Sequence, residues 1–157
     1  MTQRVIIERL SEHRDLVPLV ASWLQAEWPD WYGTSGKGSA HEDVLEYAGA
    51  GKTIPFGVVA FRDGVPCGFG ALKNDAIPPG SDRGPWVGAG YVLPELRGQG
   101  IGALVLRALT GEARRLGFLH VYCGTSTSTS LLRREGWREL EVVPHEGAQV
   151  VVFQSPA

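Results

Sequence analysis

The sequence predicts a single domain of the α/β class (α+β type), with a mixed, mostly antiparallel sheet of about seven strands flanked by about four helices. The first observation is the length, because 157 residues is the usual size of one domain. The second is the composition, which is 43% hydrophobic and 20% charged and therefore suits a folded core. The third is the order of hydrophobic patterns along the chain: βααβββ, a glycine-rich turn, then αβαββ. No internal repeat or linker interrupts residues 1–157, so we expect one domain.

The N-terminal part predicts one strand and two helices. Residues 4–10 predict the strand, and residues 14–28 predict a helix. The apolar stripe of this helix is Leu16, Leu19, Val20, Trp23 and Leu24. Pro18 fits the helix only within its first turn. Residues 29–39 are rich in glycine, serine and aromatic residues and predict a loop, and residues 41–51 predict a short helix that stops at glycine.

The middle of the chain predicts three strands. Residues 54–64 and 65–73 predict a hairpin with Asp63-Gly64 at its turn. Residues 74–84 predict a loop, and residues 85–93 predict a fourth strand that Pro94 ends.

A helix follows the glycine-rich turn, and shorter elements close the chain. The apolar residues of the helix recur at helical spacing, so one face should pack on the sheet: Ile101, Leu104, Val105, Ala108, Leu109 and Leu116. Gly111 weakens the middle of this helix, and Gly117 should end it. The remaining predictions are a strand over 119–125, a short helix over 130–136, and strands over 137–143 and 148–154.

Three glycines stand directly before the long helix, at Gly98, Gly100 and Gly102. A helix N-terminus presents unpaired N–H groups and the positive end of the helix dipole, and glycines let an anion approach closely. A phosphate or pyrophosphate is the natural ligand of such a turn. The simpler alternative is a tight strand-to-helix turn without a ligand, although one glycine would be enough for that.

Two well-known phosphate motifs fit this chain poorly. Gly98, Gly100 and Ala103 match the dinucleotide pattern GxGxxG/A, but residues 119–130 offer no acidic residue for a ribose. Gly51-Lys52-Thr53 matches the end of the phosphate loop GxxxxGK[ST], but Glu46 replaces its first glycine and a helix precedes it. A nucleotide-binding protein is therefore a remote alternative.

A third motif fits better. The pattern Q/R-x-x-G-x-G/A is present over residues 97–102, as RGQGIG, after a strand that ends in Val92-Leu93-Pro94. The stretch YVLPELRGQGIGALVLRAL resembles the coenzyme A loop of the GNAT acetyltransferase superfamily. PWVGAGYV resembles the fourth strand of that family, and a short helix followed by Gly136-Trp137 is similar to its C-terminal part. The resemblance implies the twisted GNAT sheet.

The resemblance also implies a cosubstrate, acetyl-CoA, and a place for it. The pantetheine arm would pair with a bulge at Tyr91, Val92 and Leu93 of the fourth strand. The pyrophosphate would rest on the backbone N–H groups of Arg97, Gly98, Gln99, Gly100, Ile101 and Gly102, with Gly100 and Gly102 the most important. The implied reaction is direct attack of a primary amine on the thioester, which needs a proton acceptor for the amine.

The catalytic residues depart from the family pattern. The tyrosine that protonates the leaving thiolate in the family would fall at Leu132, which cannot donate a proton. Ser126 is one substitute from the run TSTSTS over 125–130, although this run could instead cap the short helix. Residues 87–90 lack the carboxylate that many members carry on the fourth strand. Asp75 is our first candidate for the base and Glu27 our second, against the simpler reading of both as solvated charges.

The acceptor amine should lie beside the segment between the first two helices. We expect Trp28, Trp31, Tyr32 and Trp86 to contact it. Aromatic side chains beside carboxylates suit a partly apolar amine, which leaves small amines, aminoglycosides and protein N-termini open. The missing tyrosine and carboxylate favour one rival function, a CoA- or acyl-CoA-binding sensor with impaired catalysis.

Composition narrows the partners and the location. A net charge of −2 and a pI near 6.1 argue against a nucleic-acid partner that depends on bulk positive charge. The sequence shows no apolar run of membrane-spanning length and no signal peptide, so we expect a cytoplasmic protein without a membrane partner. Its two cysteines form no disulfide framework or zinc site, so we expect no metal. The apolar segment AQVVVFQ leaves a homodimer possible, although a central strand would show the same pattern.

Overall fold

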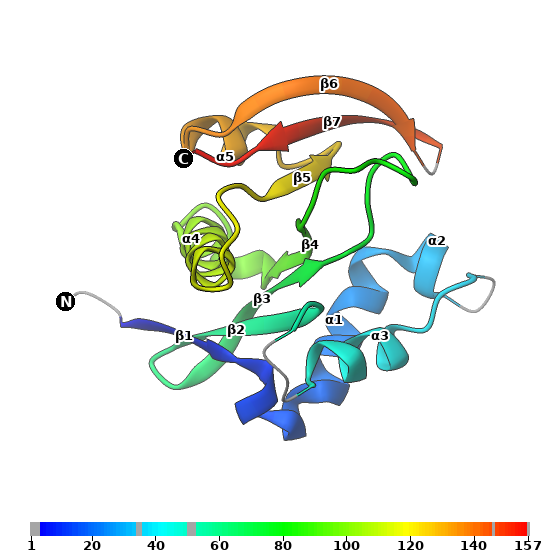
Figure 1. The fold of residues 1–157 in the computed structure, drawn as a ribbon. Helices are drawn as coiled ribbons and strands as arrows, with labels where there is room; N and C mark the ends of the chain where they lie inside the picture. The colour runs from blue at the N-terminus through cyan, green and yellow to red at the C-terminus, as the bar shows by residue number, and fades with distance from the viewer. Residues whose placement is uncertain (1–3, 34–35, 50–52, 146, 157) are drawn as a thin grey trace.

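A seven-stranded sheet forms the centre of the computed structural model, which describes residues 4–33, 36–49, 53–145 and 147–156 (Figure 1). The strands are β1 (Val5–Arg9), β2 (Phe56–Arg62), β3 (Val65–Lys73), β4 (Trp86–Val92), β5 (Tyr122–Thr125), β6 (Arg138–His145) and β7 (Ala148–Gln154). Their order is β1-β2-β3-β4-β5-β7-β6, and every neighbouring pair is antiparallel except β4 and β5. The predicted mixed, mostly antiparallel sheet is confirmed.

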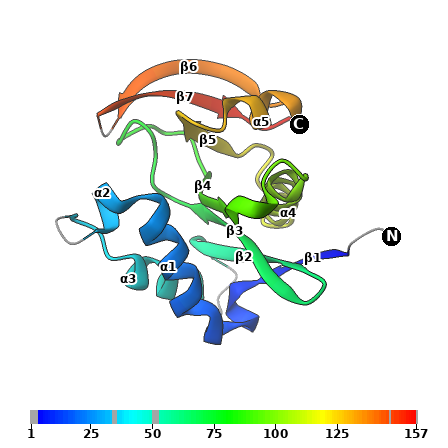
Figure 2. The same ribbon diagram turned by 180° about the vertical axis from the view of Figure 1, so that it is seen from behind.

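Helices cover both faces of this sheet (Figures 1 and 2). They are α1 (Val17–Glu27), α2 (Pro29–Tyr32), α3 (Ala40–Tyr47), α4 (Ile101–Arg115) and α5 (Thr129–Arg134), with 3-10 turns at Leu10–Glu12, Arg14–Leu16 and Pro94–Leu96. Helix α4 packs on one face in a core that includes Val105 and Leu109. Helices α1 and α3 pack on the other face, around Leu24 and Phe69. The molecule thus has two cores, with the middle strands between them.

Several predicted boundaries are wrong for local reasons. The helix predicted over 14–28 begins at Val17, which places Pro18 in its first turn, as the helix required. Part of the predicted loop over 29–39 is the four-residue helix α2, which Pro29 starts, so five helices replace four. The strand predicted over 119–125 begins only at Tyr122. Leu19 and Leu104, predicted to face the core, are exposed.

The hairpin prediction is confirmed. Strands β2 and β3 pair along their length, and Asp63 and Gly64 form the turn with φ angles of 51° and 83°. Two consecutive positive φ angles suit the right-handed twist of a two-residue hairpin, which is why Asp-Gly is favoured there.

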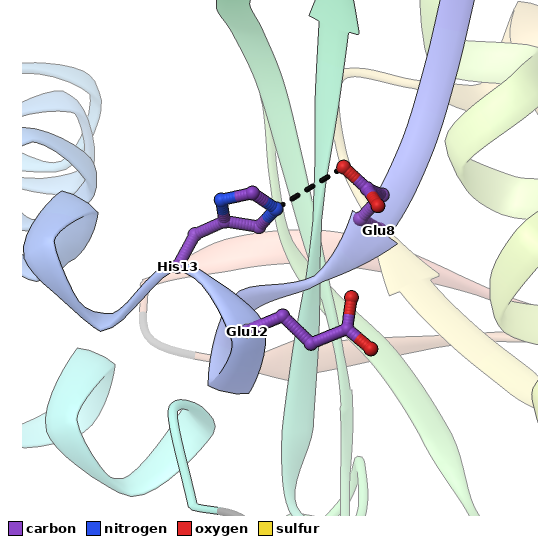
Figure 3. Close-up of side chains that lie close together, drawn as sticks. All are labelled: Glu8, Glu12 and His13. Atoms are coloured by element: carbon purple, nitrogen blue, oxygen red, sulfur yellow. Dashed lines mark hydrogen bonds and ion pairs between the residues drawn. The ribbon is translucent and has the colours of Figure 1, made fainter.

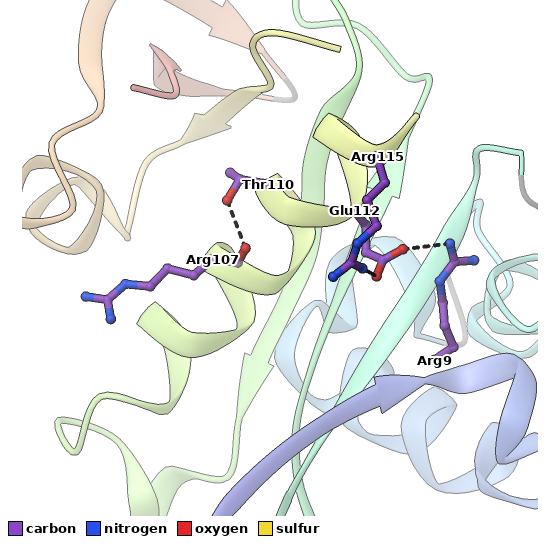
Figure 4. A network of polar contacts seen from close by, with 5 residues as sticks. All are labelled: Arg9, Arg107, Thr110, Glu112 and Arg115. Carbon is purple, nitrogen blue, oxygen red and sulfur yellow. Dashed lines mark hydrogen bonds and ion pairs between the residues drawn. The ribbon is translucent and has the colours of Figure 1, made fainter. Parts of the chain in front are cut away.

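Helix α4 is fastened to the edge strand β1 by a polar network (Figure 4). The Arg9 guanidinium donates to Glu112 across 3.0 Å, and Arg115 pairs with the same carboxylate. Arg9 also lies over the Phe56 ring, 3.6 Å from its centroid. On another side of the helix, the Thr110 hydroxyl donates to the Arg107 carbonyl at 2.9 Å. The Arg9–Glu112 ion pair therefore joins α4 to β1, whereas the Arg115 and Thr110 contacts lie within the helix.

The segment AQVVVFQ is strand β7, which lies between β5 and β6. Its apolar pattern therefore reflects burial inside the sheet, and β6 forms the edge instead.

Among the described residues, no helix combines the length and the apolar character needed to span a bilayer.

Candidate active site

Strands β4 and β5 start together and then part. Their parallel register consists of one pair, Trp86 with Tyr122. Strand β4 also bulges, because its register with β3 shifts between Gly88 and Tyr91, and Ala89 has a φ of 55°. The predicted bulge at Tyr91, Val92 and Leu93 is therefore placed too late, since the irregular residues are Ala89 and Gly90. A bulge bends its strand and increases its twist, which accounts for the divergence from β5.

The glycine turn connects β4 to α4 and presents a row of free amides. Among the residues that the structure describes, no acceptor takes the backbone N–H groups of residues 98–103. The first helical hydrogen bond beyond them runs from Leu104 N–H to the Gly100 carbonyl, at 3.2 Å. These amides stand at the positive end of a 15-residue helix, so an anion placed there would gain both hydrogen bonds and a favourable dipole.

The three glycines of the turn are required for different reasons. Gly98 and Gly100 have φ angles of 81° and 89°, a region that glycine alone adopts without strain. A Cβ at Gly102 would lie 3.3 Å from Leu131 Cδ2, so this glycine allows α4 and α5 to approach each other. Arg62 of β2 supports the turn from outside by donating to the Gln99 side chain at 2.9 Å.

Arg97 joins the turn to the first helix. Its Nε donates to the Val92 carbonyl at 2.8 Å, and its Nη2 lies 3.0 Å from the carboxylate of Glu27. The guanidinium also lies 5.4 Å from the ring centroid of Tyr91, which stacks on Trp23 of α1. Glu27, at the end of α1, is therefore held beside the C-terminal end of β4.

Asp75 lies at the other end of β4. It comes two residues after Lys73, the last residue of β3, which pairs with Trp86 at the start of β4. The carboxylate of Asp75 lies 3.4 Å from the Lys73 ammonium. Its side chain is 80% exposed. The seven residues of β4 span roughly 20 Å, so the two carboxylates that sequence selected occupy opposite ends of the strand. The structure does not bring them together.

The predicted acceptor residues separate into two groups. Trp28 and Trp31 are exposed, on and beside α2. Tyr32 is half-buried, and its hydroxyl donates to Asp43 of α3 at 2.6 Å. Burial, helped by Asp43, raises the pKa of Tyr32. Trp86 is only 2% exposed, and its indole N–H donates to the Arg83 carbonyl at 2.9 Å, so it belongs to the core.

The turn before the short helix α5 is held by a side-chain hydroxyl. The Thr125 hydroxyl accepts from the N–H groups of Thr127 and Ser128, at 3.1 and 2.9 Å. These bonds hold the turn before α5 and do not cap the helix itself, because its N-cap residue Ser128 makes no side-chain cap hydrogen bond, so the structure does not show the capping alternative for the TSTSTS run. Ser126 lies exposed in the same turn, just after β5. Cys123 of β5 is half-buried, and burial raises the pKa of its thiol to about 12.

Comparison with known proteins identifies this arrangement. A family model described as the acetyltransferase (GNAT) family matches residues 20–134. The chain belongs to the GNAT acetyltransferase family. No curated protein sequence matches it.

Several solved structures share the fold of this GNAT chain. One is an aminoglycoside 6'-N-acetyltransferase complexed with coenzyme A, with a TM-score of 0.76 and 15% identity over 96% of each chain. An aminoglycoside 6'-N-acetyltransferase from Enterococcus faecium has a TM-score of 0.74 and 17% identity, also over 96% of each chain. A third, AAC(6')-Iy in complex with CoA, has a TM-score of 0.72 and 21% identity over 92% of this chain and 95% of its own. At these identities the likeness concerns the fold.

Within this GNAT domain, Leu132 takes the place expected for the tyrosine of the family. It is 1% exposed and belongs to the core under α4. Trp137 is likewise a core residue. The structure thus gives both residues packing roles.

Two groups of side chains lie outside the residues that sequence selected. Glu8, Glu12 and His13 are close enough to hold a metal ion, but His13 Nε2 already lies 3.1 Å from Glu8, and the pair braces the corner after β1 (Figure 3). Asp43 and Tyr47 of α3 are the second group. The sequence did not indicate them as site residues, because an amphipathic helix shows its apolar stripe in the sequence but not which residues the helix contacts. Gly51 and Lys52 of the alternative phosphate loop lie outside the described residues.

Proposed function

We propose that this GNAT acetyltransferase transfers the acetyl group of acetyl-CoA to a primary amine of a small molecule or peptide, by direct attack of the amine. The observation that carries this proposal is the row of amides over residues 98–103 that have no acceptor among the described residues, after a strand that has separated from its neighbour. A coenzyme A pyrophosphate would satisfy these amides. The parted strand edge, including Tyr91, Val92 and Leu93, would pair with the pantetheine arm.

Glu27 is the better candidate for the base, which reverses the order that sequence suggested. It lies beside β4 on the side of the glycine turn, and Arg97 holds it there through a 3.0 Å ion pair. Asp75 lies beyond the opposite end of the strand and faces solvent. In our proposal Glu27 takes the amine proton, directly or through one water, as the new C–N bond forms and the C–S bond breaks.

The acceptor would enter beside α2. Trp28 and Trp31 expose their rings there, next to Glu27 and Asp30. The aminoglycoside acetyltransferases among the similar structures support a small-molecule amine. The two cysteines, Cys67 and Cys123, are free, which suits a reaction in the reducing cytoplasm.

A second candidate function is a CoA-binding sensor with impaired catalysis. The observation in its favour is Leu132, a buried aliphatic residue where the family carries a proton donor. Coenzyme A thiolate is a tolerable leaving group, so an enzyme can work without that donor, and Ser126 stays a proposed substitute.

The test is CoA release from acetyl-CoA across a panel of primary amines. We expect turnover by the wild type, and a fall in kcat of about 100-fold or more for Glu27→Gln with an unchanged Kd for acetyl-CoA. Glu12→Gln, which removes an exposed carboxylate after β1, should leave kcat unchanged. If Asp75→Asn lowers kcat and Glu27→Gln does not, the base is Asp75. If no amine releases CoA although acetyl-CoA binds, the sensor function replaces the enzyme.

A further inference from the structure

A small acidic depression lies beside α3, away from the glycine turn. It encloses about 180 Å³, and its lining residues are Asp43, Glu46, Tyr47, Pro55, Asn74 and Asp75. They come from α3, from the segment before β2 and from the segment after β3. Among the described residues, Lys73 is the one cation paired with these carboxylates, through Asp75 at 3.4 Å. Counted over the residues that the structure describes, three carboxylates face one ammonium, which gives this part of the depression a net negative charge.

Tyr47 brings a polar group from the core to the wall of this depression. The residue is 4% exposed, and its ring packs against Phe69, with centroids 5.9 Å apart. Within the described part of the chain no group hydrogen-bonds to its hydroxyl, whereas the Tyr32 hydroxyl donates to Asp43. No fully enclosed side-chain oxygen or nitrogen of the described residues lacks a partner, so the Tyr47 hydroxyl opens onto the depression that it lines. A water or a ligand in the depression would therefore complete its hydrogen bonding.

The Tyr47 hydroxyl is a neutral hydrogen-bond acceptor for a ligand in the depression. Burial and the negative charges of Asp43, Asp75 and Glu46 raise the pKa of Tyr47. The phenol therefore keeps its proton at neutral pH, and its oxygen accepts hydrogen bonds without adding charge.

The spacing of the carboxylates selects the kind of cation. In the part of the chain that the structure describes, the one group of three or more His, Cys, Asp or Glu residues with ligand atoms within 4.8 Å of one another is Glu8, Glu12 and His13. The carboxylates of the depression are spread more widely. A metal ion needs oxygens at about 2–2.6 Å on several sides. A protonated amine instead donates up to three hydrogen bonds outward, to oxygens that lie further apart.

We propose that the depression formed by Asp43, Glu46, Tyr47 and Asp75 binds the ammonium group of an organic polyamine. Two carboxylates and the Tyr47 hydroxyl would accept its hydrogen bonds. Because Asp75 follows the strand that pairs with the start of β4, the depression lies at the opposite end of β4 from the glycine turn. An extended acceptor could place a second amine here while its reacting amine lies near Glu27. That last role rests on the proposed function, whereas cation binding does not.

The test is calorimetric titration of spermidine into the protein without acetyl-CoA, at fixed ionic strength. Glu46→Gln removes an exposed carboxylate of the depression, and Tyr47→Phe removes the hydroxyl but keeps the ring that packs on Phe69. Glu12→Gln is the matched control, since it removes one exposed carboxylate elsewhere. We expect the Kd for spermidine to rise about ten-fold in Glu46→Gln and about three- to ten-fold in Tyr47→Phe, and to stay unchanged in Glu12→Gln.

Equal spermidine affinity in all four proteins would overturn the proposal, and so would the absence of binding to the wild type at millimolar concentration. Displacement of spermidine by magnesium ions at matched ionic strength would also overturn it, because it would show attraction by net charge alone. The failure of the proposed function would be visible separately, as a wild type that binds spermidine but not acetyl-CoA.

Discussion

Two helices of this domain each follow a strand on the side where the sheet opens, and their N-termini are built differently. Before α5 the Thr125 hydroxyl accepts from the amides of Thr127 and Ser128, in the turn that leads into the helix. At α4 the amides of residues 98–103 have no acceptor among the described residues, and glycines surround them. The turn before α5 is held by a side chain of its own, whereas the turn before α4 leaves its amides free for a ligand, and no side chain caps either helix. A helix start therefore indicates an anion site only when its own side chains leave the amides free.

The difference between the two helix starts can first be tested in the turn before α5. Thr125→Val keeps the shape of the side chain but removes its oxygen, so two amides lose their acceptor. We expect a loss of about 1 kcal/mol in the free energy of unfolding, with a fall in Tm of about 2–4 °C, measured by thermal and urea denaturation.

The affinity for acetyl-CoA should not change in this variant if Thr125 only holds the turn before α5. A matched control is Thr127→Val, whose exposed side chain donates or accepts no hydrogen bond in the described structure. A large loss of CoA release in Thr125→Val with normal stability would instead assign the run to catalysis.

Two glycines of α4 and its turn, Gly111 and Gly100, allow a second test. Gly111 has helical geometry and a Cβ there would meet open space, whereas Gly100 has a φ of 89° that disfavours any side chain. Gly111→Ala should stabilise the protein by about 0.5–1 kcal/mol and leave acetyl-CoA binding unchanged. Urea denaturation checks the first effect and calorimetry the second. A destabilised Gly111→Ala protein would contradict the packing described for this helix.

The parts of this fold that sequence predicted well are governed by local patterns. The hairpin follows from Asp63-Gly64, and α4 follows from its hydrophobic period and the glycines before it. Helix α2 was missed because four residues are too few to show a helical period. The predicted bulge began two residues too late in β4, because the position of a bulge depends on how β4 pairs with β3, and this pairing is a long-range property.

The candidate site was predictable only in part, for the same reason. The glycine turn is a continuous segment, and its motif could be read directly. Whether Asp75 or Glu27 lies near the reaction depends on which end of β4 each one meets, and only the folded sheet decides this. The place of the Tyr47 hydroxyl depends on packing between α3 and β3, so no sequence signal identifies it.

The central claim is that the α4 N-terminus holds the pyrophosphate of acetyl-CoA. The most direct measurement is calorimetric titration of acetyl-CoA into the wild type, Gly100→Asp and Gly117→Asp. Gly117 is the matched control, since it stands after the other end of α4 with a φ of 95° and open space around it. We predict binding to the wild type and to Gly117→Asp, and a loss of at least about 100-fold in Gly100→Asp, where a carboxylate would repel the phosphates. No binding to the wild type, or equal binding to all three proteins, would contradict the account.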